Sequence, residues 1–322
     1  MTGRLVARWR YGVLLLAIGM LAAACGGGNN DGETTGGGGT QLSGTINIDG
    51  SSTVAPLSEA AAELFQEQNE GVRVTVGTSG TGGGFEKFCA GETDISDASR
   101  AIEDDEQQAC ESKGIKYEEV QVANDGLSVV VNNENTWANC LTTAQLKAIW
   151  DKGSKVNNWN QVDPSFPNEP LKLFGAGTDS GTFDYFTNAI NGEEGRSRSD
   201  YSATEDDNVT VTGVSGTKGG LGYFGLSYLQ ENEGKIKGVQ VDGGKGCVAP
   251  STETVQNGSY TPLSRPLFIY PSDQALARPE VKAFLDFYVN NYQKIAEEAL
   301  FVPLTEAQAA EAKQKITQLA TG

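Results

Sequence analysis

From Ser43 onward, short apolar segments typical of β-strands alternate with segments whose apolar residues recur at helical spacing. This alternation is typical of an α/β domain, in which helices cover a sheet. With 322 residues, the chain is long enough to build two lobes with their own cores. We therefore predict an α/β fold with two lobes. The expected strands are 46–48, 72–76, 129–131, 171–174, 221–226, 236–241 and 267–270, and the expected helices are 57–65, 141–150, 278–300 and 305–320.

The N-terminal segment has the pattern of an export signal. A basic start precedes an apolar run, Tyr11–Leu21, that is shorter than the roughly 20 residues of a membrane span. Small residues lead to Cys25, and a Gly-rich spacer follows at once. We predict a lipoprotein signal peptide over 1–24, a lipid on Cys25 at the outer face of the plasma membrane, and a flexible tether over 25–43. The alternative is an ordinary cleaved signal that ends near a cysteine.

Charge, histidine content and cysteine spacing exclude several classes of protein. A formal net charge of −18 argues against nucleic acid as a partner and against a basic membrane-binding face. The chain has no His, which removes Ser-His-Asp and Cys-His catalysis and most zinc hydrolase chemistry. We therefore predict no cofactor and no metal. Apart from Cys25, four cysteines without C-x2-C spacing predict two disulfides in an exported protein: Cys89, Cys110, Cys140 and Cys247.

Three junctions between a strand and a helix combine Gly with Ser and Thr, namely GSSTVAP (50–56), GTSGTGGGF (77–85) and TDSGTF (178–183). Gly lets a ligand approach the backbone, and the start of a helix offers unpaired N–H groups. In α/β folds such loops converge beyond the carboxyl ends of the strands. Because none of the three contains Lys, we expect neutral donors to hold a compact oxyanion there. The alternative for any single junction is an ordinary cap and turn.

At these motifs the sequence resembles the phosphate-binding proteins of bacterial high-affinity phosphate ABC transporters. Eight segments occur in that family's order and spacing and cover most of the chain from Gly44 to about Pro271. A match of this extent is specific, although each motif alone would be weak. The segments are IDGSSTVAP, GTSGTGGGFEKF, DISDASRAI, DGLSVVVN, LTTAQLKAIW, GAGTDSGTFDYF, GGLGYFG and PLSRPLFIY.

The resemblance implies a two-lobed periplasmic-binding-protein fold, type II-like, with crossover hinges near 123–128 and 264–268. Lobe I is then 44–125 plus 266–322, and lobe II is 126–265. Bridges within a lobe leave such a hinge free, whereas bridges between lobes would restrain it. We therefore expect the disulfides Cys89–Cys110 in lobe I and Cys140–Cys247 in lobe II.

The resemblance also implies phosphate ligands, carried over motif by motif onto this sequence. All of them are hydroxyl groups or backbone N–H groups from the three junctions. They are Ser52, Thr53 and the N–H of Val54 in the first junction, Thr81 with Ser79 as a second candidate in the next, and Ser180, the N–H of Gly181 and Thr182 in the last.

The chain departs from the family pattern at two charged positions. Better-known members have an Arg shortly before the SGT motif, where this chain has Ala176-Gly177, and they have Ser-Asp where it has Ser99-Arg100. We expect Ser99 to contact the anion and Arg100 to supply the guanidinium from the other side of the cleft. The alternative is a surface ion pair of Arg100 with Glu103 or Asp104.

This exchange leaves open which carboxylate accepts the proton of phosphate. Asp179, beside SGT, and Asp97, in DISDAS, are the candidates, and the alternative for each is capping or bracing of a loop. Asn208, in EDDNV, is a candidate cap for a further helix that faces the cleft.

The function expected from these features is non-enzymatic: a monomeric protein captures inorganic phosphate and delivers it to a membrane ABC permease. Another tetrahedral oxyanion, such as sulfate, molybdate or tungstate, is the alternative ligand. A secreted phosphatase would need an activated nucleophile or a metal pair, and the sequence offers no motif for either. An adhesin or structural surface protein that reuses the fold is a third class.

Overall fold

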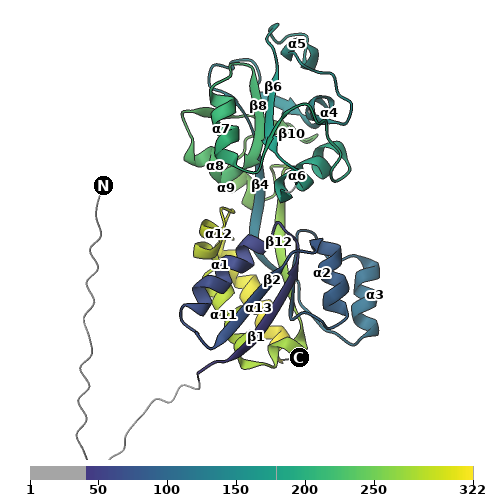
Figure 1. Cartoon of the computed structure of the whole chain (residues 1–322), viewed down its shortest axis with the longest axis vertical. Helices are drawn as coiled ribbons and strands as arrows, with labels where there is room; N and C mark the ends of the chain where they lie inside the picture. Colours follow the sequence, from purple (N-terminus) through teal and green to yellow (C-terminus); the bar gives the residue numbers. More distant parts are fainter. Residues whose placement is uncertain (1–40, 179, 322) are drawn as a thin grey trace, which may run out of the picture. The chain divides into compact units, whose positions relative to one another are not determined.

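The computed structural model describes residues 41–178 and 180–321, which form a two-lobed α/β protein (Figure 1). The expected signal peptide and the lipid site at Cys25 lie outside these residues. The strands are β1 Gly44–Gly50, β2 Val72–Gly77, β3 Ile95–Ala98, β4 Val120–Asn132, β5 Cys140–Thr142, β6 Lys172–Ala176, β7 Ser202–Thr204, β8 Gly220–Gly225, β9 Ile236–Gly238, β10 Gln240–Asp242, β11 Cys247–Val248 and β12 Ser264–Pro271.

The helices cover the sheets and fill the ends of both lobes. They are α1 Ala55–Gln66, α2 Gly80–Cys89, α3 Asp104–Ser112, α4 Thr143–Trp150, α5 Trp159–Val162, α6 Gly181–Phe186, the π-helix η1 Thr187–Asn191, α7 Asp207–Ser215, α8 Leu226–Glu231, α9 Thr252–Gln256, α10 Asp273–Leu276, α11 Pro279–Asn290, α12 Tyr292–Glu298 and α13 Glu306–Thr321.

One sheet runs through both lobes. Its path is β2-β1-β3-β12-β4-β8-β6-β7, with β9 also on β4, and a small sheet, β11-β10-β5, lies in the second lobe. The strands β4 and β12 pair in antiparallel fashion and lie side by side where the two lobes join (Figure 1). Polypeptide that crosses twice between lobes is the arrangement expected of a hinge.

The two lobes have separate hydrophobic cores, which meet at the crossover strands. In β4, Ala123 packs into the core of lobe I and Leu127 into that of lobe II. In the second crossover, Leu263 belongs to lobe II and Leu267 to lobe I. One residue departs from the predicted division: Val302, from the C-terminal segment, packs into the core of lobe II because its backbone pairs with that of Asn124 on β4.

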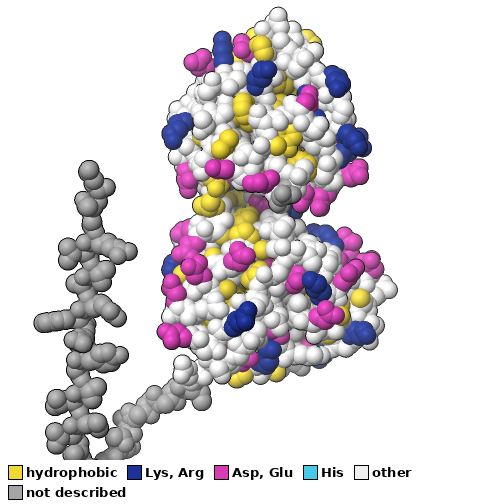
Figure 2. Space-filling view, in the orientation of Figure 1, with side chains coloured by type: hydrophobic (Ala, Val, Ile, Leu, Met, Phe, Trp, Pro, Cys, Tyr) yellow, Lys and Arg dark blue, Asp and Glu magenta, His cyan; other side chains and the backbone are white. Residues whose placement is uncertain are grey.

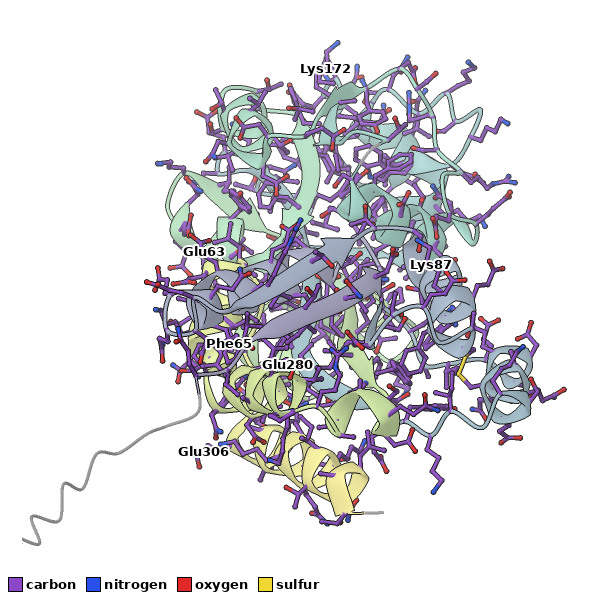
Figure 3. All side chains as sticks on the ribbon, turned by 60° about the horizontal axis from the view of Figure 1, so that its bottom comes forward. Glu63, Phe65, Lys87, Lys172, Glu280 and Glu306 are labelled. Atoms are coloured by element: carbon purple, nitrogen blue, oxygen red, sulfur yellow. A yellow bond between two sulfur atoms is a disulfide. The ribbon has the colours of Figure 1, made fainter. Side chains whose placement is uncertain are left out.

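Aromatic residues anchor both cores. Phe65 of α1, labelled in Figure 3, packs edge-on against Phe284 and Phe287 of α11 with ring centroids 5.4 and 5.5 Å apart. Trp150 at the end of α4 packs edge-on against Tyr223 of β8 at 5.0 Å. Such pairs add about 0.5–1.5 kcal/mol each beyond the burial of their area. Aromatic packing therefore stabilises the core of each lobe.

Both predicted disulfides are confirmed. Cys89 bonds to Cys110 and joins α2 to α3 in lobe I, and Cys140 bonds to Cys247 and joins β5 to β11 in lobe II. Neither bridge connects the lobes, so neither restrains the crossover strands.

Two of the predicted elements are wrong in detail. The helix expected over 278–300 is broken into α11 and α12 at Asn291, because the backbone of Asn291 leaves the helical conformation (φ −109°, ψ 18°) and its side chain donates to the carbonyl of Phe287. The strand expected over 236–241 is split between two sheets, since β9 pairs with β4 and β10 pairs with β5 and β11. The capping box at Thr142 and Gln145 is confirmed as the start of α4.

Acidic side chains are scattered over both lobes on the face shown in Figure 2, which agrees with the net charge of −18. In the part of the chain that the structure describes, no helix combines the length and the apolar character that crossing a bilayer requires.

Candidate functional site

A cavity of about 530 Å³ lies between the lobes, beside the crossover strands. The loop after β1, the start of α2 and the segment after β3 line it from lobe I, and α6, η1 and the residues that follow line it from lobe II. The lining residues are Ser51, Ser52, Thr53, Ser79, Gly80, Thr81, Gly82, Gly83, Ser99, Arg100, Gly181, Asp184, Tyr185, Asn188, Ala189, Glu194 and Arg265. Seven of them are predicted ligands or ligand candidates: Ser52, Thr53, Ser79, Thr81, Ser99, Arg100 and Gly181.

The two lobes approach each other closely at Thr53 and Gly181. A Cβ atom placed on Gly181 would lie 2.7 Å from Oγ1 of Thr53 and 3.4 Å from its Cα and N atoms. An added Cβ would have to displace the hydroxyl of Thr53, whereas it would be at contact distance from the backbone of that residue. The hydroxyl of Thr53 and the backbone of Gly181 can therefore contact the same small ligand.

The start of α2 contributes backbone donors and one hydroxyl pair. Thr81 accepts a hydrogen bond from the N–H of Ser99, and the two hydroxyls lie 3.2 Å apart. The first amides of a helix lack intrahelical partners and favour anions. Gly84 allows α2 to pack close to the end of β1, because a Cβ on Gly84 would lie 2.5 Å from the Cα of Gly50. Glycine is a poor helix former, so this contact explains its presence within α2.

Ser79 lines the same cavity, but it already has a carboxylate partner. Its hydroxyl and its N–H donate to Oδ1 of Asp49 at 2.5 and 3.1 Å. Lys87, labelled in Figure 3, pairs with Oδ2 of Asp49 at 2.6 Å. These contacts hold the pKa of Asp49 below its usual range, although burial acts in the opposite direction as the largest single influence. Ser79 therefore braces the start of α2 against β1.

Arg100 lines the cavity, and its charge is balanced within its own lobe. The guanidinium forms a two-pronged contact with Glu106 at 2.8 Å on both sides and a contact with Glu103 at 3.2 Å. The hydrogen bonds from Arg100 to Glu106 are the main cause that raises the pKa of Arg100. Arg100 thus lines the cavity, where its role as an anion ligand stays a prediction, and it forms the ion pair with Glu103 that was the alternative.

Arg265 is a lining residue that sequence reasoning missed. Its Nε atom donates to Oδ2 of Asp125 at 3.2 Å, and its Nη2 atom donates to Oγ1 of Thr53 at 3.2 Å. The guanidinium carbon lies 3.7 Å from the centre of the Tyr185 ring. A signal was present, because Arg265 is the charged residue of PLSRPLFIY and falls inside the predicted second crossover.

Asp97 does not line the cavity; it is fully buried behind the loop after β1. Ser58 donates to its Oδ1 at 2.8 Å, and its backbone carbonyl accepts from the N–H of Ser51. Burial raises the pKa of Asp97 to about 8, and the charges of Asp49 and Glu59 add to this, against the hydrogen bond from Ser58. Asp97 therefore supports the loop after β1 from behind.

The buried carboxyl of Asp97 predicts a pH-dependent stability. Folding raises the pKa of Asp97 from 3.8 to about 8. The contribution of this carboxyl to the free energy of unfolding is therefore fully present below pH 3.8 and is lost as the pH rises towards 8. Asp97→Asn keeps the acceptor for Ser58 and removes the ionisation. We expect the free energy of unfolding of the variant to rise relative to that of the wild type by at least about 1 kcal/mol between pH 5 and pH 8. Urea titrations at both pH values measure it, and an unchanged difference would contradict it.

Carboxylates also line the lobe II side of the cavity. Asp184 of α6 is half-buried, and Glu194 is exposed near it. Burial raises the pKa of Asp184, Glu194 adds to the effect and Arg265 opposes it. Among the described residues, no group of three or more His, Cys, Asp and Glu side chains is placed to hold a metal. The cavity thus offers neutral donors, two arginines that already have carboxylate partners, and carboxylates that can accept a proton.

The other candidate residues lie away from this cavity or in supporting positions. Val54 is buried, and its N–H donates to the carbonyl of Ser51. Ser180 caps α6 by accepting from the N–H of Thr182, and Thr182 lines a separate hollow that also includes Asp125. The expectation for Asn208 is wrong, since Asp206 caps α7 and accepts from the N–H of Asn208. Asp179 lies outside the described residues.

Two lobes on a paired crossover, with hydroxyls and amides of both facing one cavity, define the class of solute-binding proteins. Comparison with known proteins specifies the family. Residues 35–291 match the family model described as a PBP superfamily domain. The protein SphX of Synechococcus elongatus is 50% identical over 280 residues, covering 86% of this chain and 82% of that protein. The phosphate-binding protein PstS of Staphylococcus saprophyticus is 40% identical over 281 residues, covering 86% and 85%.

Solved structures agree with this. The crystal structure of "a possible phosphate binding protein" from Planctomyces limnophilus is 48% identical, with a TM-score of 0.82, and the match covers 87% of this chain and 99% of that one. The chain belongs to the PBP superfamily and, within it, to the family of phosphate-binding proteins that includes PstS.

Proposed function

We propose that this protein captures inorganic phosphate in the cavity between its lobes and delivers it, chemically unchanged, to the permease of a phosphate ABC transporter. Membership of the PstS family supports this proposal, as does the donor set of the cavity. The observation that carries it is the convergence of Thr53 and Gly181, from opposite lobes, on one point. A tetrahedral anion presents acceptor oxygens in several directions, so it can join both.

The donors are sufficient for tight binding without a free positive charge. A hydrogen bond to a charged group contributes about 1.5–3 kcal/mol, and micromolar binding requires about 8 kcal/mol. The proposed donors are Ser52, Thr53, Thr81, Ser99, Ser180, the N–H groups of Val54 and Gly181, and Thr182, together with Arg100. Ser180, Val54 and Thr182 would have to reach the anion through a movement of their loops, because they do not line the cavity in this structure.

Closure of the lobes is part of the proposal. We assign 44–125 and 266–322 to lobe I and 126–265 to lobe II, which agrees with the division of the cores apart from Val302. The cavity is much larger than one phosphate ion, so the lobes must approach each other for donors beyond Thr53 and Gly181 to contact the same anion.

Phosphate should therefore compact and stabilise the protein. We expect saturating phosphate to reduce the radius of gyration in small-angle scattering, and a concentration of a thousand times the Kd to add about 4 kcal/mol to the free energy of unfolding. Calorimetric titration supplies the Kd for this comparison. An unchanged scattering profile at saturation would contradict a clamp, and no heat of binding and no stabilisation would contradict phosphate binding itself.

The N-terminal segment completes the proposal. We infer that residues 1–24 direct export, that a lipid on Cys25 holds the protein at the outer face of the plasma membrane, and that the tether lets a monomer reach its permease. Intact mass spectrometry of the mature protein tests the anchor, because a chain that begins at an unmodified residue after Cys25 would exclude it.

A further inference from the structure

The pair formed by Arg265 and Asp125 lies on the hinge itself. The two residues are register partners on β12 and β4, at the point where both strands leave one core and enter the other. Their side chains are 19% and 7% exposed, so the ion pair is shielded from solvent. A shielded pair of this kind fixes the position of its guanidinium, since losing one partner leaves a buried charge.

Contacts from both lobes converge on the same guanidinium. From lobe I, Thr53 accepts from Nη2 at 3.2 Å. From lobe II, the ring of Tyr185 packs against the guanidinium carbon at 3.7 Å, and the hydroxyl of Tyr185 donates to the carbonyl of Pro262 at 2.9 Å, just before β12. Arg265 is thus in contact with both walls of the cavity and with both crossover strands.

The guanidinium also faces the cavity with unused capacity. Nε and Nη2 have partners, whereas Nη1 forms no hydrogen bond within residues 41–178 and 180–321. A planar guanidinium can donate to two oxygens of a phosphate while it keeps a further partner at Nε. An anion seated at Thr53 would lie beside this side chain, because Thr53 already accepts from Nη2.

We propose that Arg265 is an anion ligand mounted on the hinge, and that through its pair with Asp125 it makes closure of the lobes depend on the bound anion. The inference rests on the proposed binding of phosphate in this cavity. Without the anion, the charge of Arg265 is balanced by Asp125 alone. With the anion, Arg265 joins it to Thr53, to Tyr185 and to the crossover strands at once.

The test compares Arg265→Gln and Arg265→Lys with the wild type in two measurements: phosphate Kd by calorimetry and compaction by small-angle scattering at saturating phosphate. Arg196→Gln is the matched control, because Arg196 pairs with Asp151 and lies outside the cavity. We expect Arg265→Gln to weaken phosphate at least about tenfold and to close incompletely even when saturated. Arg265→Lys should recover part of both losses, and Arg196→Gln should match the wild type.

Two results would overturn the inference. One is a folded Arg265→Gln with a phosphate Kd within twofold of the wild type and full compaction. The other is a loss of affinity with full compaction at saturation and no recovery in Arg265→Lys, which would mark a purely structural role. If Arg265→Gln does not fold, the phosphate Kd and the compaction of Arg265→Lys are compared with those of the wild type. A Kd within twofold and full compaction would then overturn the inference. A wild type that does not bind phosphate would instead refute the proposed function, so the two failures are distinguishable.

Discussion

Sulfate should bind at least about a hundredfold more weakly than phosphate. The two anions have nearly the same size and shape, so hydroxyls and amides cannot separate them strongly. At neutral pH phosphate keeps a proton, which an ionised carboxylate can accept, whereas sulfate offers only acceptors. An unpaired carboxylate facing sulfate costs about 1–3 kcal/mol, and repulsion between like charges adds to this. Calorimetry with both anions on the wild type measures the ratio, and comparable affinities would contradict the carboxylate argument.

Variants identify the carboxylate. We propose Asp179 and Asp184 as the acceptor candidates, since Asp179 adjoins the SGT motif and Asp184 lines the cavity. Replacing the true acceptor by Asn should lower the phosphate affinity modestly and reduce the ratio of the phosphate affinity to the sulfate affinity. Asp97→Asn is the control and should leave the ratio of the two affinities unchanged, because Asp97 is buried behind the loop after β1. If neither Asp179→Asn nor Asp184→Asn changes the ratio of the phosphate and sulfate affinities, neither of these two carboxylates makes the choice.

Gly181→Val should weaken phosphate at least about a hundredfold. Even a Cβ atom on Gly181 would lie 2.7 Å from Oγ1 of Thr53, so a branched side chain must push the two loops apart. The anion would then keep the donors of only one lobe, and losing two hydrogen bonds to a charged group costs about 3–6 kcal/mol. Calorimetry measures the loss.

The control for this variant is Gly225→Val in lobe II, where the nearest atom to an added Cβ is 3.8 Å away. It should bind phosphate as the wild type does. Thermal unfolding without phosphate checks that both variants are folded. A phosphate Kd for Gly181→Val within tenfold of the wild type would show that the two loops need not meet around the ligand.

Local sequence patterns predicted several of the elements, but only a part of the central strand. The alternation of Val72, Val74 and Val76 corresponds to β2, and the apolar face from Leu57 to Phe65 corresponds to α1. By contrast, only 129–131 was predicted of the 13-residue strand β4. Its middle reads Asn124-Asp125-Gly126, which favours a turn when read locally. Pairing with β12 and the packing of two cores overrides that preference, and neither can be deduced from a local pattern.

The candidate site shows the same limit. The junction motifs identified loops at strand ends, and the structure brings Thr53, Thr81, Ser99 and Gly181 to one cavity. They could not show which of several neighbouring groups faces the ligand, because a helix start directs Val54 inward and Thr182 towards a different hollow. Arg265 was missed because its importance comes from a register partner 140 residues away.

A crystal structure of the protein with phosphate would test the central claim most directly. The account predicts one phosphate between the lobes, within hydrogen-bond distance of the Thr53 hydroxyl and of the Gly181 N–H, with the lobes closer together than in the present structure. A phosphate held by one lobe alone, or bound outside this cavity, would contradict it.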